Sequence, residues 1–318
     1  MLRKYTSLLL TIGFLVLFVW YGWTHQEIFT DLTNIAVWAL ALIVVGKLIN
    51  VWTTGIFTKW TVEAFTDTLT QAEAFVVSVL TAIGNFFGPL FGGLGIRAVY
   101  LKKYHNLPYS KFTATLIGYF LMMLQFNSLL AIAGLLLLPH NNQTNFVLLV
   151  FVGWFLAFLL LTVMRLPQRE KLAGIEKMKL ARPIIKTLYD IEDGWKLLVS
   201  KKKLLFQMMG LAVANLVALY AVNYIEFVAL DIHVTPAAMM LYTAVVQASL
   251  LLSLTPGAVG LRETILIILG TTLGISNQQI IQVAILDRGI YFIMLGILFL
   301  MTRHSTFRNR AVSAAAEA

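Results

Sequence analysis

The sequence predicts an all-α integral membrane protein with about six full transmembrane helices and two re-entrant helical hairpins arranged as an inverted repeat. Three observations lead to this prediction. Of the 318 residues, 59% are hydrophobic and 12% are charged, whereas soluble domains carry roughly 25% charged residues. Long apolar runs recur along the chain, and a short motif with glycine and arginine occurs twice inside apolar regions. The alternative is eight transmembrane helices, with each hairpin replaced by one bent crossing.

Six uninterrupted apolar runs are near the length of about 20 residues that a bilayer crossing requires. They lie at about 7–24, 33–53, 112–138, 146–164, 204–222 and 279–301. The first run follows Arg3 and Lys4 and in this respect resembles a signal peptide. It lacks a small-x-small cleavage site, so we interpret it as an uncleaved first span.

Two further apolar regions, at about 74–104 and 236–273, are interrupted near their middles by proline and glycine. Residues 92–97 and 257–262 both read G-x-x-G-x-R. Proline and glycine break helices and arginine is costly in hydrocarbon, so the repeated motif predicts a broken, re-entrant structure beside a polar site. The residues expected at the two breaks are Pro89, Gly92, Gly95, Pro256, Gly257 and Gly260.

The distribution of charge favours hairpins over full crossings. With a cytoplasmic N-terminus and two hairpins, every lysine and arginine except Lys47, Arg97, Arg262 and Arg288 falls in a cytoplasmic segment, as the positive-inside rule requires. The outer loops then contain no lysine or arginine, and their charged residues are all acidic, namely Glu27, Asp31, Glu226 and Asp231. This topology predicts a multi-pass protein of the cell (plasma) membrane with both termini cytoplasmic. The hairpins enter from opposite sides, which makes the two regions halves of an inverted repeat.

We expect one polytopic transmembrane domain over residues 1–302 and a cytoplasmic tail over 303–318. The first repeat covers about 33–138 and the second about 204–301. Between them, a basic cytoplasmic connector at 165–203 is expected to touch anionic headgroups or, alternatively, to bind a regulatory partner. Pro183 is expected to split the connector into two short helices. Because the basic residues lie in short loops between spans, the net charge of +9 does not indicate a nucleic-acid partner.

Arg97 and Arg262, which end the two copies of the motif, are the strongest candidates for binding an anion. A guanidinium carries a fixed charge and donors that suit phosphate oxygens. The glycines before it let backbone approach a ligand, and a half-helix that starts there directs its positive end at an anion. The structural alternative is an arginine that pairs internally, for example with Glu263, or that snorkels to headgroups.

Charged residues of the second half could assist these arginines. Glu263 follows Arg262 directly, and Asp287 and Arg288 lie inside the last span. We expect Arg288 to join Arg97 and Arg262 in binding lipid phosphate. We expect Glu263 and Asp287 to balance charge or to carry a coupling proton.

Other polar residues in the apolar runs have structural interpretations. Lys47 is expected to snorkel toward the cytoplasmic end of its span. Glu73 is expected to be solvated at the entrance of the first hairpin. Helix–helix hydrogen bonding explains uncharged polar residues such as Asn85 and Gln247 as well as a ligand site does.

The sequence contains no pattern typical of catalysis or metal binding. It has no cysteine, and its five histidines are scattered, so it offers neither a thiol nucleophile nor a metal motif. A glycine-rich phosphate loop followed by Lys-Ser/Thr is missing, which argues against ATP-driven transport by this chain. We therefore expect no metal, no cofactor and no enzymatic activity.

The same motifs resemble the lysylphosphatidylglycerol synthase transmembrane-domain family, also called the flippase-like domain family. The second half matches in the sequence LTPGAVGLRE at 254–263, in Gly-Ile-Ser at 274–276 and in the Asp-Arg pair at 287–288. The first half resembles the family's earlier glycine-rich motif from residue 88 to Arg97. It departs from the family pattern because Ala98 stands where the second copy has an acidic residue. Bifunctional members carry a separate synthase domain, and the resemblance implies the flippase-type unit without it.

The resemblance and the arginines together imply a lipid flippase or transporter. The expected substrate is a lipid with an anionic headgroup, which could be a phospholipid, an aminoacylated phospholipid or a polyprenyl phosphate. The alternatives are a secondary transporter of a small soluble anion and a membrane enzyme that acts on lipid. The expected partners are the lipid and the bilayer, and a homodimer is left open.

Overall fold

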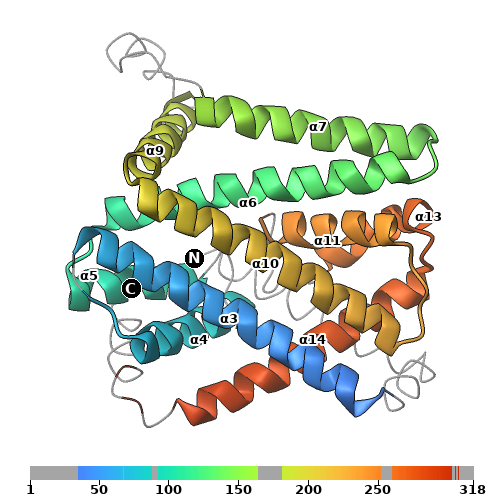
Figure 1. Ribbon diagram of the computed structural model, residues 1–318, viewed down its shortest axis with the longest axis horizontal. Helices are drawn as coiled ribbons and strands as arrows, with labels where there is room; N and C mark the ends of the chain where they lie inside the picture. The colour runs from blue at the N-terminus through green and yellow to red at the C-terminus, as the bar shows by residue number, and fades with distance from the viewer. Residues whose placement is uncertain are drawn as a thin grey trace.

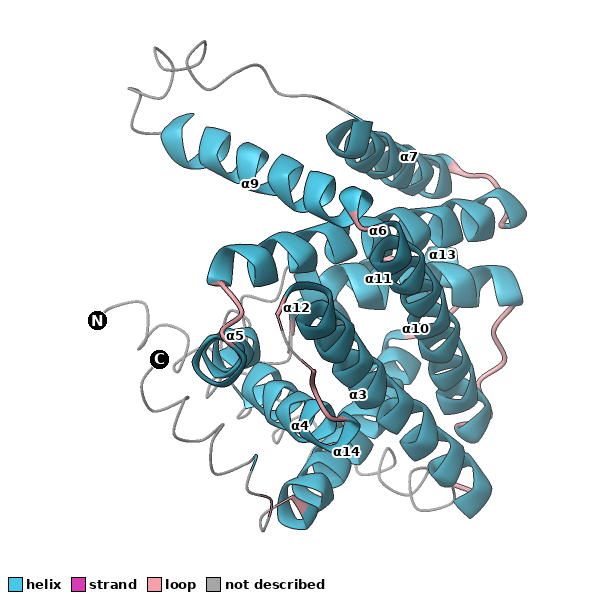
Figure 2. Ribbon diagram, turned by 60° about the vertical axis from the view of Figure 1, so that its left-hand side comes forward, coloured by secondary structure: helices cyan, strands magenta, loops and turns pink. Residues whose placement is uncertain are grey.

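The computed structural model describes residues 35–66, 68–87, 92–163, 181–251, 260–302, 305 and 307. The regular elements in this part of the chain are helices, and none of its residues forms a strand (Figure 2). The helices are α3 (Val37–Phe65), α4 (Gln71–Phe87), α5 (Gly92–His105), α6 (Tyr109–Leu137), α7 (Asn142–Val163), α9 (Ala181–Ser200), α10 (Lys202–Ala229), α11 (Pro236–Leu251), α12 (Leu261–Ile268), α13 (Gly270–Leu273) and α14 (Asn277–Met301).

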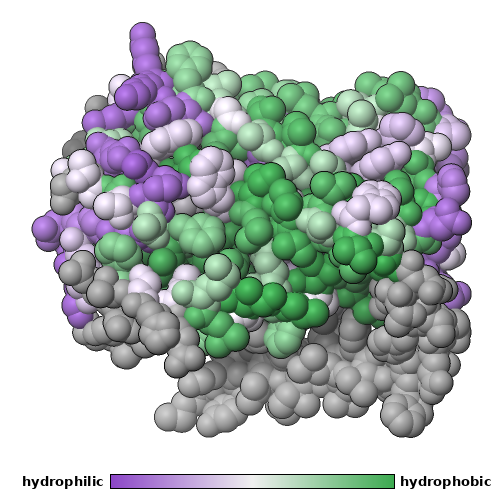
Figure 3. Space-filling view, turned by 60° about the horizontal axis from the view of Figure 1, so that its bottom comes forward, coloured by the Kyte–Doolittle hydropathy of each residue, from purple (hydrophilic) through white to green (hydrophobic). Residues whose placement is uncertain are grey.

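Five of these helices, α3, α6, α7, α10 and α14, are long and apolar enough to cross a membrane. Figure 1 shows them running along the length of the molecule. They correspond to five of the six predicted spans, and the sixth, at 7–24, lies outside the described residues. Figure 3 shows hydrophobic side chains across the middle of one face and hydrophilic side chains toward both ends. The chain is a multi-pass membrane protein, and the part that the structure describes is all-helical.

Helix α3 is longer than predicted because its polar residues bond to their own helix. The hydroxyls of Thr54, Thr58 and Thr61 each donate to the backbone carbonyl four residues earlier, at 2.8–3.1 Å. A threonine satisfied in this way can continue a helix through an apolar environment. The helix therefore runs to Phe65, although the apolar run predicted to span ends near residue 53.

Helices α4 and α5 form a closely packed pair next to α3 (Figures 1 and 2). A Cβ atom on Gly93 would lie 1.9 Å from the carbonyl oxygen of Thr81, and one on Gly84 would lie 2.7 Å from the Cα of Gly93. Side chains at these positions would therefore separate the two helices. The pair begins and ends at the end of the molecule where α3 ends and α6 begins (Figure 1).

The second broken region also forms a helical pair. Helix α11 packs against the short helices α12 and α13, and this unit begins and ends at the opposite end of the molecule, where α10 ends and α14 begins (Figure 1). Gly92, Gly95 and Gly260 lie in the described part of the two pairs, at or near the start of the second helix. Pro89, Pro256 and Gly257 lie outside the described residues.

The connector is described from Ala181 onward, where α9 begins. Pro183 lies in the first turn of this helix, where a missing backbone N–H removes no helical bond. From residue 181 to Ser200 the connector is a single helix, and α10 follows directly at Lys202. The preceding residues, 164–180, are outside the described part, as is most of the predicted tail.

Candidate functional site

A cavity of about 360 Å³ lies among eight helices, α3 to α6, α10 to α12 and α14. Arg97, Arg262 and Arg288 line it, together with Asp287. The two motif copies, 165 residues apart in the sequence, therefore direct their arginines to the same space. Buried apolar residues form one cluster around α11 and another around α4 and α5, and the cavity is lined by residues from both.

Four of the predicted site residues form one ionic network. Arg262 donates from Nη1 to Asp287 Oδ2 at 2.7 Å and from Nε to Glu263 Oε1 at 3.2 Å. Arg288 donates from Nη2 to the same Glu263 oxygen at 2.7 Å. Asp287 and Arg288, although adjacent in sequence, thus hold different partners on α12, as the angle of about 100° between neighbouring helical residues allows.

The local structure at the start of α12 holds Glu263 in place. Gly260 precedes the helix with φ at +83°, in the region that favours glycine. Its backbone N–H donates to Glu263 Oε2 at 2.8 Å. A carboxylate in the first turn of a helix is also favoured by the helix dipole. Glu263 therefore accepts hydrogen bonds from two arginines and the backbone.

Lys47 and Glu226 extend the network, and the predictions for both residues were wrong. Lys47 is 6% exposed and forms ion pairs with Glu226, at 3.1 Å, and with Asp287. It does not snorkel. Glu226 lies within α10 and is 1% exposed, not in an outer loop, because α10 continues to Ala229. The sequence did contain a signal for this pairing. Lys47 and Asp287 lie in two separate apolar spans, and charged residues within spans usually pair with one another.

The network is balanced in charge. Three cations, Lys47, Arg262 and Arg288, contact three carboxylates, Glu226, Glu263 and Asp287. Taking an ion out of water costs several kcal/mol, and a partner with good geometry is needed to offset this. Mutual neutralisation explains how six ionisable side chains can be accommodated within a membrane domain.

Arg97 has a different environment. It is 3% exposed and donates from Nη1 to the hydroxyl of Thr58 at 3.2 Å. Its guanidinium carbon lies 5.4 Å from the ring centroids of both Phe57 and Phe112. Within the described part of the chain, Arg97 pairs with no carboxylate, and its Nε donates to no acceptor. It is a buried charge that the aromatic rings stabilise only partly.

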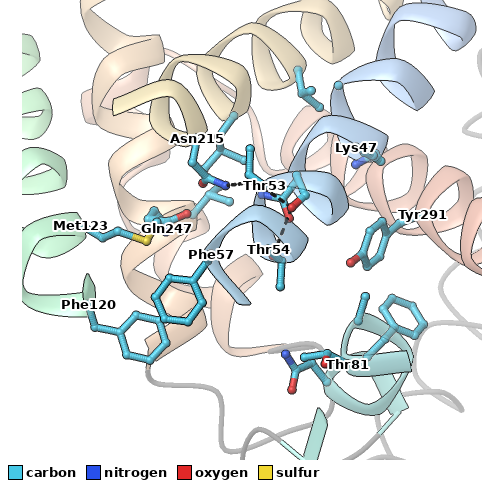
Figure 4. A pocket seen from close by; sticks show the side chains of 18 of the residues that line it. Lys47, Thr53, Thr54, Phe57, Thr81, Phe120, Met123, Asn215, Gln247 and Tyr291 are labelled. Atoms are coloured by element: carbon cyan, nitrogen blue, oxygen red, sulfur yellow. Dashed lines mark hydrogen bonds between the residues drawn. The ribbon is translucent and has the colours of Figure 1, made fainter. Parts of the chain in front are cut away.

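The wall between Arg97 and the ionic network is polar but uncharged. Asn215 donates from Nδ2 to Thr53 Oγ1 at 3.1 Å, and the hydroxyl of Thr54 donates to the carbonyl of Asn50 (Figure 4). Gln247 extends toward this group from α11 (Figure 4). On the left of Figure 4, Phe57, Phe120 and Met123 supply an apolar side. The cavity is therefore amphipathic.

The family comparison agrees with this architecture. The model of the family described as "Lysylphosphatidylglycerol synthase TM region" matches residues 6–298. The chain belongs to this family. The predicted resemblance is thereby confirmed, and the family relates the chain to membrane proteins that handle lipids. No curated protein sequence matches the chain.

A second polar cluster lies where α4 begins and α5 ends. Glu73 is buried and accepts hydrogen bonds from the hydroxyl of Tyr100 and from His105 Nε2, the latter at 3.0 Å. The expectation that Glu73 is solvated was wrong, because α5 folds back over the start of α4. The cluster joins the two ends of the pair.

The uncharged polar residues of the spans divide into two kinds. Asn127 donates from Nδ2 to the carbonyl of Ala244 at 3.0 Å and so joins α6 to α11, as helix–helix hydrogen bonding predicts. Gln247 lines the cavity and forms no hydrogen bond with another described residue. Among the described residues, no group of three or more His, Asp or Glu side chains could hold a metal ion.

Proposed function

We propose that this protein moves a lipid with an anionic headgroup between the two leaflets of the cell membrane. The observation that carries the proposal is Arg97, a buried guanidinium that faces a cavity and has no carboxylate partner among the described residues. An uncompensated buried charge is unfavourable, and a phosphate group would neutralise it with the paired hydrogen bonds that a guanidinium makes best.

The two sides of the cavity support a lipid in preference to a small soluble anion. Phe57, Phe120 and Met123 lie on one side, and Lys47 and Tyr291 lie on the other (Figure 4). A ligand with both a charged and an apolar part can satisfy both sides. Membership of a family that handles lipids points the same way.

We further propose that the two helical pairs are the re-entrant hairpins of an inverted repeat. The α4–α5 unit opens toward one end of the molecule and the α11–α12 unit toward the other (Figure 1). Each carries its arginine one to five residues after the start of its second helix. In such repeats, broken helices meet at the binding site, and one half rocks against the other to expose it to each side in turn.

The ionic network has a supporting role in this proposal. Glu263 and Asp287 hold the side chains of Arg262 and Arg288 at the cavity wall and balance their charge, which leaves Arg97 as the cation available to the headgroup. Glu263 accepts bonds from Arg262, Arg288 and the backbone of Gly260. Each of these donors favours the ionised carboxylate. We therefore assign Glu263 and Asp287 to charge balance, and not to proton coupling.

The test is transfer of a fluorescent anionic lipid across reconstituted vesicles by the Arg97→Gln variant. Losing a charge-assisted contact in a site shielded from water costs roughly 2–5 kcal/mol, so lipid binding should fall by at least about 25-fold. Arg97→Lys, which keeps the charge but not the planar fork, should be intermediate. The protein should still fold, because the substitution removes one hydrogen bond and a buried charge.

The control is Lys102→Gln, five residues further along α5, where the side chain is exposed. It should leave transfer unchanged. Wild-type transfer rates in folded Arg97→Gln would refute the proposal. Arg97-dependent uptake of free phosphate without lipid transfer would instead identify a transporter of a soluble anion.

A further inference from the structure

One helix face of α3 runs along the cavity and carries polar side chains of three kinds. Lys47, Asn50, Thr54 and Thr58 follow each other at spacings of three or four residues, which places them on one side of the helix. Lys47 at one end belongs to the balanced ionic network, and Thr58 at the other end accepts the bond from Arg97. Asn50 and Thr58 are about 12 Å apart along the axis, at 1.5 Å per residue.

Five amides line the cavity, and we refer to three of them, Asn50, Asn215 and Gln247, as the amide face. The side chains of Asn50 and Gln247 form no hydrogen bond with another described residue. The side-chain amide of Asn215 donates one hydrogen bond to Thr53, and its Oδ1 accepts none from another described residue. Amides offer both donors and acceptors, and hydroxyl groups can use both. The amide face therefore suits an uncharged, hydroxyl-bearing ligand.

The charges of the cavity disfavour a cationic group. Three of the cations that line the cavity, Lys47, Arg262 and Arg288, are balanced by the carboxylates of the ionic network, so Arg97 gives the lining a net positive charge. Asp287 is already paired with Lys47 and Arg262. An ammonium group would therefore find no free carboxylate among the described lining residues and would meet the unbalanced positive charge of Arg97. Such like-charge juxtaposition discriminates strongly between ligands.

We infer that the transported headgroup carries one phosphate and uncharged hydroxyl groups, as in a glycerol- or sugar-linked phospholipid or polyprenyl phosphate, and that an ammonium-bearing headgroup is rejected. The phosphate contacts Arg97 and the hydroxyls contact the amide face. This inference rests on the proposed function and narrows its substrate class, because it excludes headgroups with a free amino group.

The test compares three lipids with identical acyl chains in binding to the purified full-length protein, measured by native mass spectrometry. Phosphatidylglycerol has a phosphodiester and hydroxyls, phosphatidylethanol has the same charge without hydroxyls, and phosphatidylethanolamine adds an ammonium. We expect phosphatidylglycerol to bind about tenfold more tightly than phosphatidylethanol, equivalent to 1.4 kcal/mol, and phosphatidylethanolamine to bind most weakly.

The double variant Asn50→Leu/Gln247→Leu should abolish the preference for phosphatidylglycerol while leaving phosphatidylethanol binding within about twofold of the wild type. Gln278→Leu, at an exposed amide of α14 outside the cavity, is the matched control and should change neither. If the leucine variant does not fold, Asn50→Ala/Gln247→Ala makes the same comparison with smaller side chains.

Equal binding of phosphatidylglycerol and phosphatidylethanolamine would overturn the inference and leave the proposed function standing. Equal weakening of both anionic lipids by the double variant would overturn it too. Failure of every phospholipid, and of a sugar-linked polyprenyl phosphate, to bind would refute the proposed function itself. Glycerol 3-phosphate serves as a soluble competitor, and displacement of phosphatidylglycerol at equal concentration would identify a free phosphate ester as the ligand.

Discussion

Removing the positive charge of Lys47 should destabilise the protein far more than removing the charge of a lysine near the surface. Lys47→Met leaves Glu226 buried at 1% exposure without its cation, while Asp287 keeps Arg262. Breaking one side of a buried ion pair typically costs about 3–5 kcal/mol. Lys59 is 29% exposed and pairs with Glu63, which is 36% exposed, one turn away. Such helical pairs near the surface contribute about 0.3–0.5 kcal/mol. The loss of stability for Lys47→Met should therefore be about tenfold larger than for Lys59→Met.

A second substitution distinguishes a stranded charge from lost packing. Adding Glu226→Gln to Lys47→Met removes the buried carboxylate, so the double variant should recover at least about half of the lost stability. Adding Asp287→Asn should give no recovery, because Arg262 then loses a partner. The measurement is reversible unfolding in detergent micelles, with thermal midpoints as a first comparison. Equal stability of Lys47→Met and Lys59→Met, or a double variant no more stable than Lys47→Met, would refute the reasoning.

Two further predictions concern the α4–α5 pair and the topology. Gly93→Ala should destabilise the protein by about 1–3 kcal/mol by overpacking, because the new Cβ would lie 1.9 Å from the carbonyl oxygen of Thr81. Gly95→Ala is the control and should be neutral, because a Cβ there would have no atom within 4 Å. Equal unfolding midpoints for the two variants would contradict this packing. Single cysteines in this cysteine-free chain should report topology through impermeant thiol reagents. The exposed sites are Asn142, Asn277, Lys103 and Ser200. We expect the first two to label from outside and the last two only from inside, and outside labelling at residue 103 would make the first hairpin a full crossing.

The sequence by itself determined the class of the protein and most of its long helices. An apolar run of sufficient length must be helical in a bilayer, because its backbone has no other hydrogen-bond partners. This local rule identified five helices that the structure describes. It also singled out Arg97, Arg262 and Arg288, because a charge within an apolar run is costly and needs a partner or a function wherever the helix packs.

The tertiary structure alone decided which charges meet. The cost of desolvation requires that Lys47 and Glu226 have partners, but it does not identify them, since Lys47 and Asp287 are 240 residues apart in the sequence. The same applies to the contrast between the two motif copies. Both end in arginine, yet the packing of α12 against α14 supplies carboxylates to Arg262, whereas α3 and α6 supply Arg97 with one hydroxyl and two aromatic rings. Short motifs specify which side chains are present, and the packing of distant helices specifies which of them remain unpaired.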